Sequence, residues 1–319
     1  MTGGLDTEDW ALPPGFDRRL TPARADLAAD WLRGRIRASQ FTMGERMTIG
    51  APVADLRPRP DYEARIDTQL LCGETVEVYE RCADWLWVRC LTDGYVGYLD
   101  AAAAAPAGPP PTHRVACRAA LRFPSPDIKA QAIRLPWPAR VSVVERVSGS
   151  GTRGLFGRLA SGGYVTMAQI APIEALASDW VAEAEALTGV PYLWGGRSAD
   201  GLDCSALLQL ALETAGVPFP RDSDMQAATA GAPGVDAVEM GAGLLRGDLV
   251  FWRGHVGVMQ DDERLLHANA HHMAVASEPL AKAAARIAEA EGLEILSILR
   301  LDPAKMPREN PSANYLRGS

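Results

Sequence analysis

The same short pattern of alternating residues occurs twice in this chain. Val76-Glu-Val-Tyr-Glu-Arg81 resembles Val141-Ser-Val-Val-Glu-Arg146 at an interval of 65 residues. Gly94-Tyr-Val96 resembles Gly163-Tyr-Val165 at an interval of 69 residues, so we expect a four-residue insertion in the second copy, near residues 149–153. Short strands bounded by glycines and repeated over about 60 residues are typical of small β-barrels. The repeat therefore predicts two such barrels in the N-terminal half of the chain.

The first copy shows the strand signals clearly. Residues 75–79 and 85–90 mix β-branched and aromatic residues with polar ones, and glycine-containing turns bound them. We expect the first barrel over residues 49–102 and the second over residues 112–173. Between them, residues 101–111 are an alanine run followed by prolines and a glycine, which predicts a linker.

The segment that precedes the barrels, residues 1–48, predicts a helical arm. Thr21 is suited to cap a helix and Pro22 to occupy its first position, so we expect a helix over residues 22–33.

The order of elements changes after residue 174. Helix patterns closed by glycines come first, and a run of strands follows. This order predicts an α+β domain with a largely antiparallel sheet over residues 174–302, followed by a tail over residues 303–319. The expected helices cover 178–188, 205–215 and 279–291, and the expected strands cover 248–252, 255–259, 265–268 and 294–300.

Length, charge and cysteine content narrow the class of protein. The 319 residues fit two or three domains. The 32 Lys and Arg against 40 Asp and Glu give a net charge of −8, which argues against general binding to nucleic acid or to anionic membranes. The N-terminus lacks the pattern of a signal peptide, no apolar run is long enough to span a bilayer, and the five cysteines form no CxxC pair. We therefore expect a cytoplasmic protein without membrane insertion or nucleic-acid partners.

Cys204 has the surroundings of a nucleophile. The glycine-rich stretches Pro191-Tyr-Leu-Trp-Gly-Gly196 and Gly201-Leu-Asp-Cys204-Ser205 bracket it, and it falls in the first turn of an expected helix. Unpaired N–H groups and the helix dipole there lower the pKa of a thiol, and the thiolate is the attacking form. The Cys204 N–H also suits a developing oxyanion. The alternative is a buried structural thiol, which we expect for the remaining cysteines, Cys72, Cys82, Cys90 and Cys117.

A thiol nucleophile needs a base, and two of the five histidines suit that role. His255 and His267 fall on consecutive expected strands, and we place the centre of their connection at Asp261. In an antiparallel hairpin that register sets the two imidazoles opposite each other on one face, within hydrogen-bonding reach. His255 is then the general base, and His267 fixes its tautomer. The alternative is a pair of structural histidines.

A metal site is the other chemistry that clustered histidines suggest. His267, His271 and His272 have acidic neighbours, but their spacing does not suit ligands in a strand and loop. Neither an HExxH motif nor a cysteine pair is present. We therefore expect no metal and no cofactor.

Several motifs in order make residues 175–275 similar to the NlpC/P60 cysteine peptidases, whose domain has a papain-like fold. The resemblance implies hydrolysis of bonds in peptidoglycan stem peptides, with Cys204, His255 and His267 as the catalytic triad. The motifs are Pro191–Gly196, Asp203-Cys-Ser205, Pro220-Arg-Asp-Ser223 with Gln226, Arg246–Trp252, His255-Val-Gly-Val258 and Leu266-His-Ala268.

The two barrels resemble bacterial SH3-like domains, and their place before an NlpC/P60 domain resembles the γ-D-glutamyl-L-diamino acid endopeptidases of the dipeptidyl-peptidase VI type. This resemblance implies a murein peptide with a free N-terminal L-Ala as substrate, release of L-Ala-γ-D-Glu, and a role in peptide recycling. It implies that Asp203 meets the substrate's ammonium group. It further implies contacts from the first barrel through Tyr95, with Glu63 or Glu74 as an acidic partner. The other implied substrate-binding residues are Tyr192, Trp194 and Ser205.

Two other functions stay open from the sequence. One is a wall-fragment binding module with an idle peptidase domain, and the other is an exported hydrolase that acts on the intact wall. The preferred diamino acid and the oligomeric state do not follow from the residues.

Overall fold

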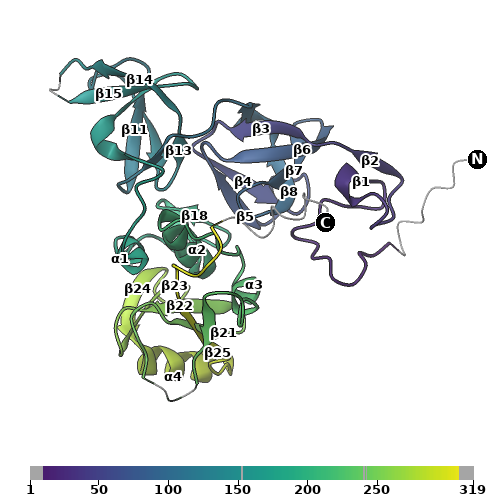
Figure 1. The fold of residues 1–319 in the computed structure, drawn as a ribbon, viewed down its shortest axis with the longest axis vertical. Coiled ribbons are helices and arrows are strands. Elements are labelled where there is room, and N and C mark those ends of the chain that lie inside the picture. The colour runs from purple at the N-terminus through teal and green to yellow at the C-terminus, as the bar shows by residue number, and fades with distance from the viewer. Residues whose placement is uncertain (1–9, 152–153, 240, 242, 309–319) are drawn as a thin grey trace, which may run out of the picture. The chain divides into compact units, whose positions relative to one another are not determined.

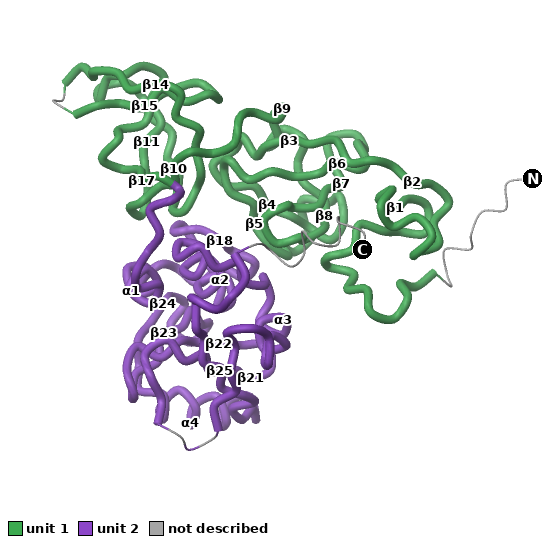
Figure 2. Tube along the Cα trace, in the orientation of Figure 1, with its two compact units in different colours: residues 1–172, 311–319 green, residues 173–310 purple. Residues whose placement is uncertain are grey.

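The computed structural model describes residues 10–151, 154–239, 241 and 243–308 (Figure 1). The chain divides into two compact units, of which the first ends at Pro172 and the second begins at Ile173 (Figure 2). Among the described residues, no helix combines the length and the apolar composition that crossing a bilayer requires.

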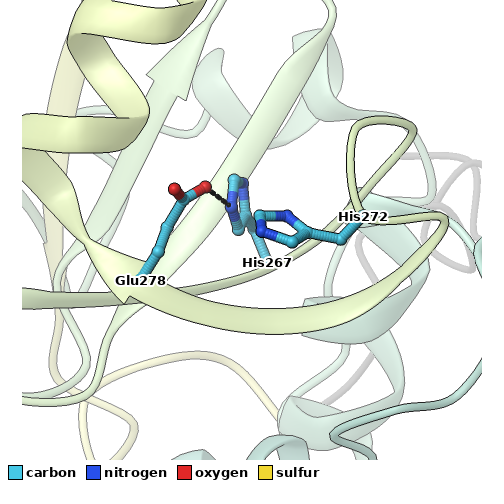
Figure 3. Close-up of side chains that lie close together, drawn as sticks. All are labelled: His267, His272 and Glu278. Carbon is cyan, nitrogen blue, oxygen red and sulfur yellow. Dashed lines mark hydrogen bonds and ion pairs between the residues drawn. The ribbon is translucent and has the colours of Figure 1, made fainter.

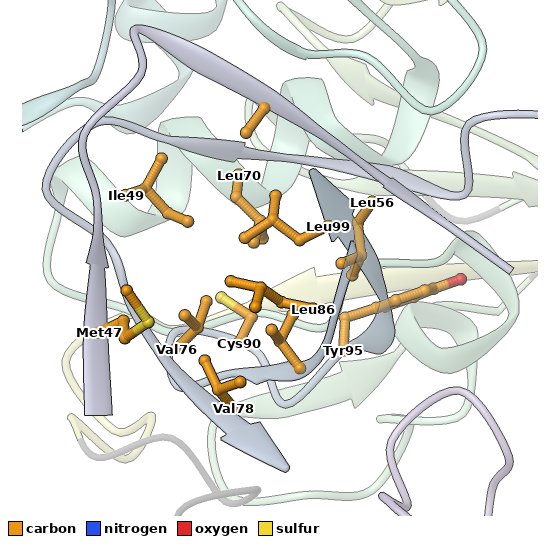
Figure 4. Packing of buried hydrophobic residues seen from close by; sticks show 12 residues of the cluster. Met47, Ile49, Leu56, Leu70, Val76, Val78, Leu86, Cys90, Tyr95 and Leu99 are labelled. Atoms are coloured by element: carbon orange, nitrogen blue, oxygen red, sulfur yellow. The ribbon is translucent and has the colours of Figure 1, made fainter. Parts of the chain in front are cut away.

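The first barrel is a single antiparallel sheet. Its strands are β3 Glu45–Ile49, β4 Val53–Arg57, β5 Thr68–Leu71, β6 Thr75–Cys82, β7 Trp85–Cys90, β8 Val96–Asp100 and β9 Ala104–Pro106. They pair in the order β5-β4-β8-β7-β6-β3-β9. Alternate residues such as Val76, Val78 and Leu86 point inward and form a buried core (Figure 4). Each fully buried aliphatic side chain of this kind stabilises the fold by about 1.5–3 kcal/mol.

The second barrel repeats the strand order of the first. Its strands are β10 His113–Val115, β11 Ala119–Phe123, β12 Ile133–Pro136, β13 Arg140–Val141, β14 Val143–Ser148, β15 Leu155–Leu159, β16 Tyr164–Thr166 and β17 Ile170–Pro172. They pair as β12-β11-β16-β15-β14 and β13-β10-β17. With β13 and β14 together in the place of β6, the two orders are the same. The predicted repeat is therefore confirmed at the level of topology.

Finer details of the repeat agree as well. The first copy has an irregularity in register between Val78 and Glu80, and the second copy has one between Val143 and Glu145, again 65 residues later. The connection from β14 to β15 has six residues where the connection from β6 to β7 has two. The four-residue insertion therefore lies in the connection from β14 to β15, near residues 149–153 as predicted.

The predicted helix over residues 22–33 is wrong. This stretch forms the strand β1 Leu27–Ala29 and the short 3-10 helix η1 Asp30–Leu32, and β1 pairs in parallel with β2 Gln40–Thr42. Its apolar residues are buried against Tyr79 and Trp87 of the first barrel. Packing on that surface outweighs the helical preference of the alanines, because propensity differences are only a few tenths of a kcal/mol per residue.

The predicted linker over residues 101–111 is wrong in its first half. Ala101–Ala103 form the 3-10 helix η2, whose start is capped by the Asp100 side chain, and β9 then closes the barrel against β3. The second copy has the 3-10 helix η3 Met167–Gln169 before β17 at the same place. The alanine run is therefore the last part of the first copy of the repeat.

The second unit is a mixed helix and sheet domain. It contains α1 Trp180–Glu185, β18 Arg197–Ser198, β19 Gly201–Leu202, α2 Cys204–Thr214, α3 Ser223–Ala227, β20 Val235–Ala237, β21 Leu249–Trp252, β22 His255–Met259, β23 Arg264–Asn269, β24 Ala274–Pro279, α4 Leu280–Glu291 and β25 Ser297–Leu301. Six of the strands form one antiparallel sheet in the order β20-β25-β21-β22-β23-β24. The predicted α+β class is confirmed, with the first predicted helix shortened to six residues.

Two helices cover this sheet. Ala283 and Ile287 of α4 pack with Val250, Met259 and Leu265 of the strands in one apolar cluster. Helix α2 packs against β22 and β23, and Figure 1 shows α2 and α4 on either side of the sheet. The sheet thereby carries the two histidine-bearing strands between the two helices.

Candidate functional site

Cys204 is the first residue of α2 and only 7% exposed. The chain reaches it through the β18–β19 hairpin, whose residues Gly196 and Gly201 approach each other closely. A Cβ on Gly196 would lie 2.6 Å from the Gly201 carbonyl oxygen, so only glycine fits there. The glycine-rich sequence before the cysteine thus folds tightly behind the start of the helix.

Asp203 caps α2 and is bound from several directions. Its carboxylate accepts the Ala206 N–H at 2.9 Å, the Gly195 N–H at 3.1 Å and the Ser205 hydroxyl at 3.2 Å. The Arg221 guanidinium donates to both carboxylate oxygens, at 2.9 and 2.7 Å, and is itself 1% exposed. The charge of Asp203 is therefore already neutralised inside the domain. The contact of Asp203 with a substrate ammonium group stays a prediction.

Gln226 holds the start of α2 from the other side. Its amide nitrogen donates to the carbonyl oxygens of Ser205 and Pro220, at 3.0 and 2.8 Å. Arg221 and Gln226 belong to one of the sequence motifs, but the motif does not indicate a role for either residue. The structure shows them bracing the backbone on which the candidate nucleophile sits.

The predicted low pKa of Cys204 is wrong. Burial raises the pKa of the thiol to about 12, and the negative charge of Asp203 adds to the rise. The N–H groups of Val256 and Ser205 and the Arg221 cation oppose it only in part. Burial is the larger of the two causes, and it outweighs what the helix start contributes.

The two histidines are brought together, but not in the predicted register. Val258 lies opposite Leu266 and Met259 opposite Leu265, which sets His267 opposite Gly257 rather than His255. The shift of two residues keeps both imidazoles on one face, because side chains alternate with a period of two. His255 Nε2 and His267 Nδ1 lie 2.8 Å apart. The predicted hydrogen bond is therefore present, formed diagonally across the strands.

A carboxylate that the sequence analysis missed extends this pair. His267 is fully buried, and its Nε2 lies 2.9 Å from Glu278 Oε1 on the neighbouring strand β24 (Figure 3). The same carboxylate oxygen contacts Arg286 of α4. Residues 274–279 show only a weak strand pattern, so this placement could not be predicted from their alternation.

A metal site was the competing use of these residues. Side-chain atoms of His267, His272 and Glu278 lie within 4.8 Å of one another. Both ring nitrogens of His267 already have hydrogen-bond partners, and His272 Nδ1 lies 3.0 Å from Asn269 Oδ1. The arrangement is a hydrogen-bonded chain that a metal ion would have to interrupt.

Both imidazoles are neutral near pH 7. Burial, with the neighbouring His267, lowers the pKa of His255 to about 3. Burial lowers the pKa of His267 to about 4, although Glu278 acts in the opposite direction. In the described part of the chain, the Cys204 sulfur and the His255 ring form no hydrogen bond with each other. The Val256 N–H instead reaches the sulfur from the residue after His255.

The remaining predicted residues of this unit lie in different surroundings. Burial, followed by the nearby Cys204 and Asp203, raises the pKa of Tyr192 to about 12, so its phenol belongs to the same cluster. Ser205 is buried and bonds to Asp203, whereas Trp194 is 64% exposed.

The predicted first-barrel residues belong to the other unit. Tyr95 is 4% exposed and its ring is part of the barrel core (Figure 4). Glu74 is also buried, where its carboxylate accepts the Leu71 N–H at 2.7 Å. Glu63 is exposed. Of the two acidic candidates, only Glu63 presents its side chain to solvent.

A buried cysteine at the start of a helix that packs on two strands bearing a hydrogen-bonded histidine pair is an arrangement typical of cysteine hydrolases. Comparison with known families agrees with this class. Residues 189–286 match the NlpC/P60 family and residues 56–103 match the bacterial dipeptidyl-peptidase SH3 domain. The chain therefore joins a dipeptidyl-peptidase SH3 domain to an NlpC/P60 domain, as the motifs predicted.

Individual proteins are similar to this chain over most of its length. Dipeptidyl-peptidase 6 of Lysinibacillus sphaericus is 28% identical over 69% of this chain and 86% of its own length. Gamma-D-glutamyl-L-lysine dipeptidyl-peptidase of Bacillus cereus is 25% identical over 68% of this chain and 71% of its own length. The crystal structure of an NlpC/P60 family protein from Bacillus cereus matches the fold with a TM-score of 0.63, at 20% identity, over 74% of this chain and 94% of that one.

Proposed function

We propose that the protein is a cysteine endopeptidase that hydrolyses the bond between γ-D-glutamate and the diamino acid in free murein stem peptides with an N-terminal L-Ala. The observation that carries the proposal is that helix α2, which begins at Cys204, packs against the two strands that bear the neutral His255–His267 pair. The names of the two relatives support the bond and the substrate class. A role in recycling wall peptides within the cytoplasm is part of the same proposal.

The proposed reaction starts from a neutral thiol and a neutral imidazole. As the Cys204 sulfur attacks the γ-carbonyl carbon, its proton passes to His255, and the oxyanion is held by the Cys204 N–H. The imidazolium then protonates the leaving amine, the C–N bond breaks, and a thioester remains. His255 next takes a proton from water, which attacks the thioester and releases L-Ala-γ-D-Glu. The thiol is regenerated, and His267 supports His255 throughout.

Substrate selection is assigned to residues around the nucleophile and on the first barrel. Tyr192, Ser205 and Trp194 are the proposed contacts in the catalytic domain, and Tyr95 is the proposed contact from the barrel. We assign the free amine of the substrate to Asp203, with Glu63 or Glu74 as a further acidic partner on the first barrel. A carboxylate facing an ammonium group separates free peptides from those still linked to glycan.

The decisive experiment is product analysis with L-Ala-γ-D-Glu-diaminopimelate. Cys204→Ala should abolish release of L-Ala-γ-D-Glu because the attacking sulfur is gone, while Cys72→Ala, another buried thiol, should retain activity. Unchanged turnover in Cys204→Ala would end the proposal. A free tripeptide should be cut much faster than an N-blocked one, and equal rates would point instead to an exported hydrolase of intact wall.

One observation favours a second function, a wall-fragment binding module without activity. Cys204 is only 7% exposed, and this burial raises the pKa of its thiol to about 12, as expected for an idle site. Iodoacetamide labelling distinguishes the two functions. In a peptidase a bound substrate analogue should protect the Cys204 thiol from labelling, and in an idle module calorimetry should detect tripeptide binding without turnover.

A further inference from the structure

The histidine pair continues into a carboxylate and an arginine. His255 Nε2 and His267 Nδ1 are 2.8 Å apart, and His267 Nε2 and Glu278 Oε1 are 2.9 Å apart. Arg286 of α4 contacts the same oxygen of Glu278. Each of these two hydrogen bonds, His255–His267 and His267–Glu278, holds one proton. The protonation state of one side chain therefore fixes that of the next.

The direction of these protons follows from the carboxylate. Burial works against ionisation of Glu278, but its bonds to His267 and Arg286 prevail and hold the pKa of the carboxyl below its usual range. An ionised carboxylate accepts and cannot donate, so His267 must carry its proton on Nε2. A neutral His267 then has a bare Nδ1, which accepts the Nε2–H of His255. The Nδ1 of His255 is left unprotonated.

Arg286 prevents this chain from protonating fully. Its positive charge lowers the pKa of both His255 and His267 and neutralises Glu278. A Glu278 without that partner would favour a doubly protonated His267, whose Nδ1–H would donate to His255. The proton of His255 would then sit on Nδ1, and the base would be lost.

We propose that Glu278, with Arg286, is a positioning residue that fixes the tautomers of both histidines and keeps the Nδ1 of His255 free to accept the thiol proton. The role rests on the proposed function, since the proton concerned is that of Cys204. It is a role that neither the sequence motifs nor the family matches assign to these two residues.

The first test is spectroscopic and does not depend on turnover. In the full chain with ¹⁵N-labelled histidine, the nitrogen shifts of His255 and His267 should both show the Nε2–H tautomer. Glu278→Leu should convert at least one of them to a mixture, because the acceptor that selects the tautomer is gone. Glu278→Gln retains an acceptor oxygen and should restore most of the pattern, and the exposed Glu289→Gln on α4 serves as the matched control.

The second test separates catalysis from binding. Glu278→Leu should lower kcat on the tripeptide by about 10- to 100-fold, the usual effect of losing a group that orients a catalytic histidine, and leave KM nearly unchanged. Glu278→Gln should recover much of that loss. If Glu278→Leu does not fold, Arg286→Met gives the same comparison, with the His267 ring expected to gain a proton.

The two proposals fail in different ways. Wild-type tautomers in Glu278→Leu would overturn the positioning role, whatever the activity, and so would an unchanged kcat in an active enzyme. An inactive wild type with the expected tautomer change would overturn the peptidase function and leave the hydrogen-bonded chain in place.

Discussion

The candidate site has two sides, and each ends in a carboxylate held by an arginine. On the thiol side Asp203 pairs with Arg221, and the side chains are 13% and 1% exposed. On the histidine side Glu278 pairs with Arg286, and the side chains are 14% and 25% exposed. The two pairs look alike, but their further partners differ. Asp203 is bound by two backbone N–H groups and a hydroxyl, whereas Glu278 is bound by an imidazole.

This difference shows how one type of ion pair serves two purposes. Backbone N–H groups cannot change protonation near neutral pH, so the Asp203 pair fixes the position of the chain around Cys204. An imidazole exists in two tautomers, so the Glu278 pair selects the position of a proton. The partners of each carboxylate, more than its own charge, decide which purpose it serves.

The largest expected difference between the two sides is in stability. Arg221→Met leaves Asp203 as an unpaired charge in the interior and should lower the free energy of unfolding by about 3–5 kcal/mol. Arg286→Met removes a pair nearer the surface and should cost about 1 kcal/mol or less. Urea unfolding monitored by fluorescence of the full chain measures both. Equal losses would show that the two pairs do not differ in the way proposed here.

The two sides should also respond to opposite ends of the pH scale. The folded-state pKa values of His255 and His267, about 3 and 4, lie below the ordinary value of 6.5. The unfolded chain therefore binds protons first as the pH falls, and the stability contributed by the histidine side is complete above about pH 6.5 and is lost below it. In this range the free energy of unfolding should fall by about 1.4 kcal/mol per pH unit for each histidine. His255→Gln should reduce this dependence of the free energy of unfolding on pH.

On the thiol side the sign is reversed. The pKa of Cys204 rises from 9.0 to about 12 on folding, so its contribution is complete below pH 9 and is lost as the pH rises toward 12. Thermal unfolding of wild type and Cys204→Ala between pH 8 and about 10.5 measures it. Parallel curves for the two proteins would contradict the burial of this thiol.

A further prediction concerns the close approach of strands β22 and β23. A Cβ on Gly257 would lie 2.8 Å from the Leu265 side chain and 3.1 Å from the His267 Cβ. Gly257→Ala should therefore cost about 1–3 kcal/mol, and displacement of the His267 ring should lower kcat. Gly243→Ala, which has open space around its Cβ position, is the control. A fully active Gly257→Ala would mean that the diagonal contact tolerates movement.

The sequence predicted the elements of the site better than their register. Cys204 at a helix start and two histidines on one sheet face both follow from local patterns. The exact register does not, because it depends on the turn. The Asp261 carboxylate accepts the N–H groups of Glu263 and Arg264, and Gln260 bonds to Arg264. The centre of the hairpin therefore lies one residue later than predicted, so the residue opposite each position of the strand is shifted by two.

Other features depend on contacts that a single sequence does not show. Glu278 meets His267 through the pairing of β23 with β24, and the alternation of residues 274–279 is too weak to predict that strand. The segment 22–33 has the residues of a helix but lies on the aromatic surface of the first barrel. The pKa of Cys204 depends on burial and on its capping carboxylate, and the helix position alone suggests the wrong direction.

The alanine run that ends the first barrel has a practical consequence for dividing the chain. Strand β3 bonds to β6 on one side and to β9 on the other. A fragment cut at residue 101 would leave the outer edge of β3 unpaired and open to another chain, which favours aggregation. A fragment that ends after Pro111 keeps the edge covered. Isolation of the barrel as a soluble piece therefore depends on retaining the short strand Ala104–Pro106, whose backbone pairs with β3.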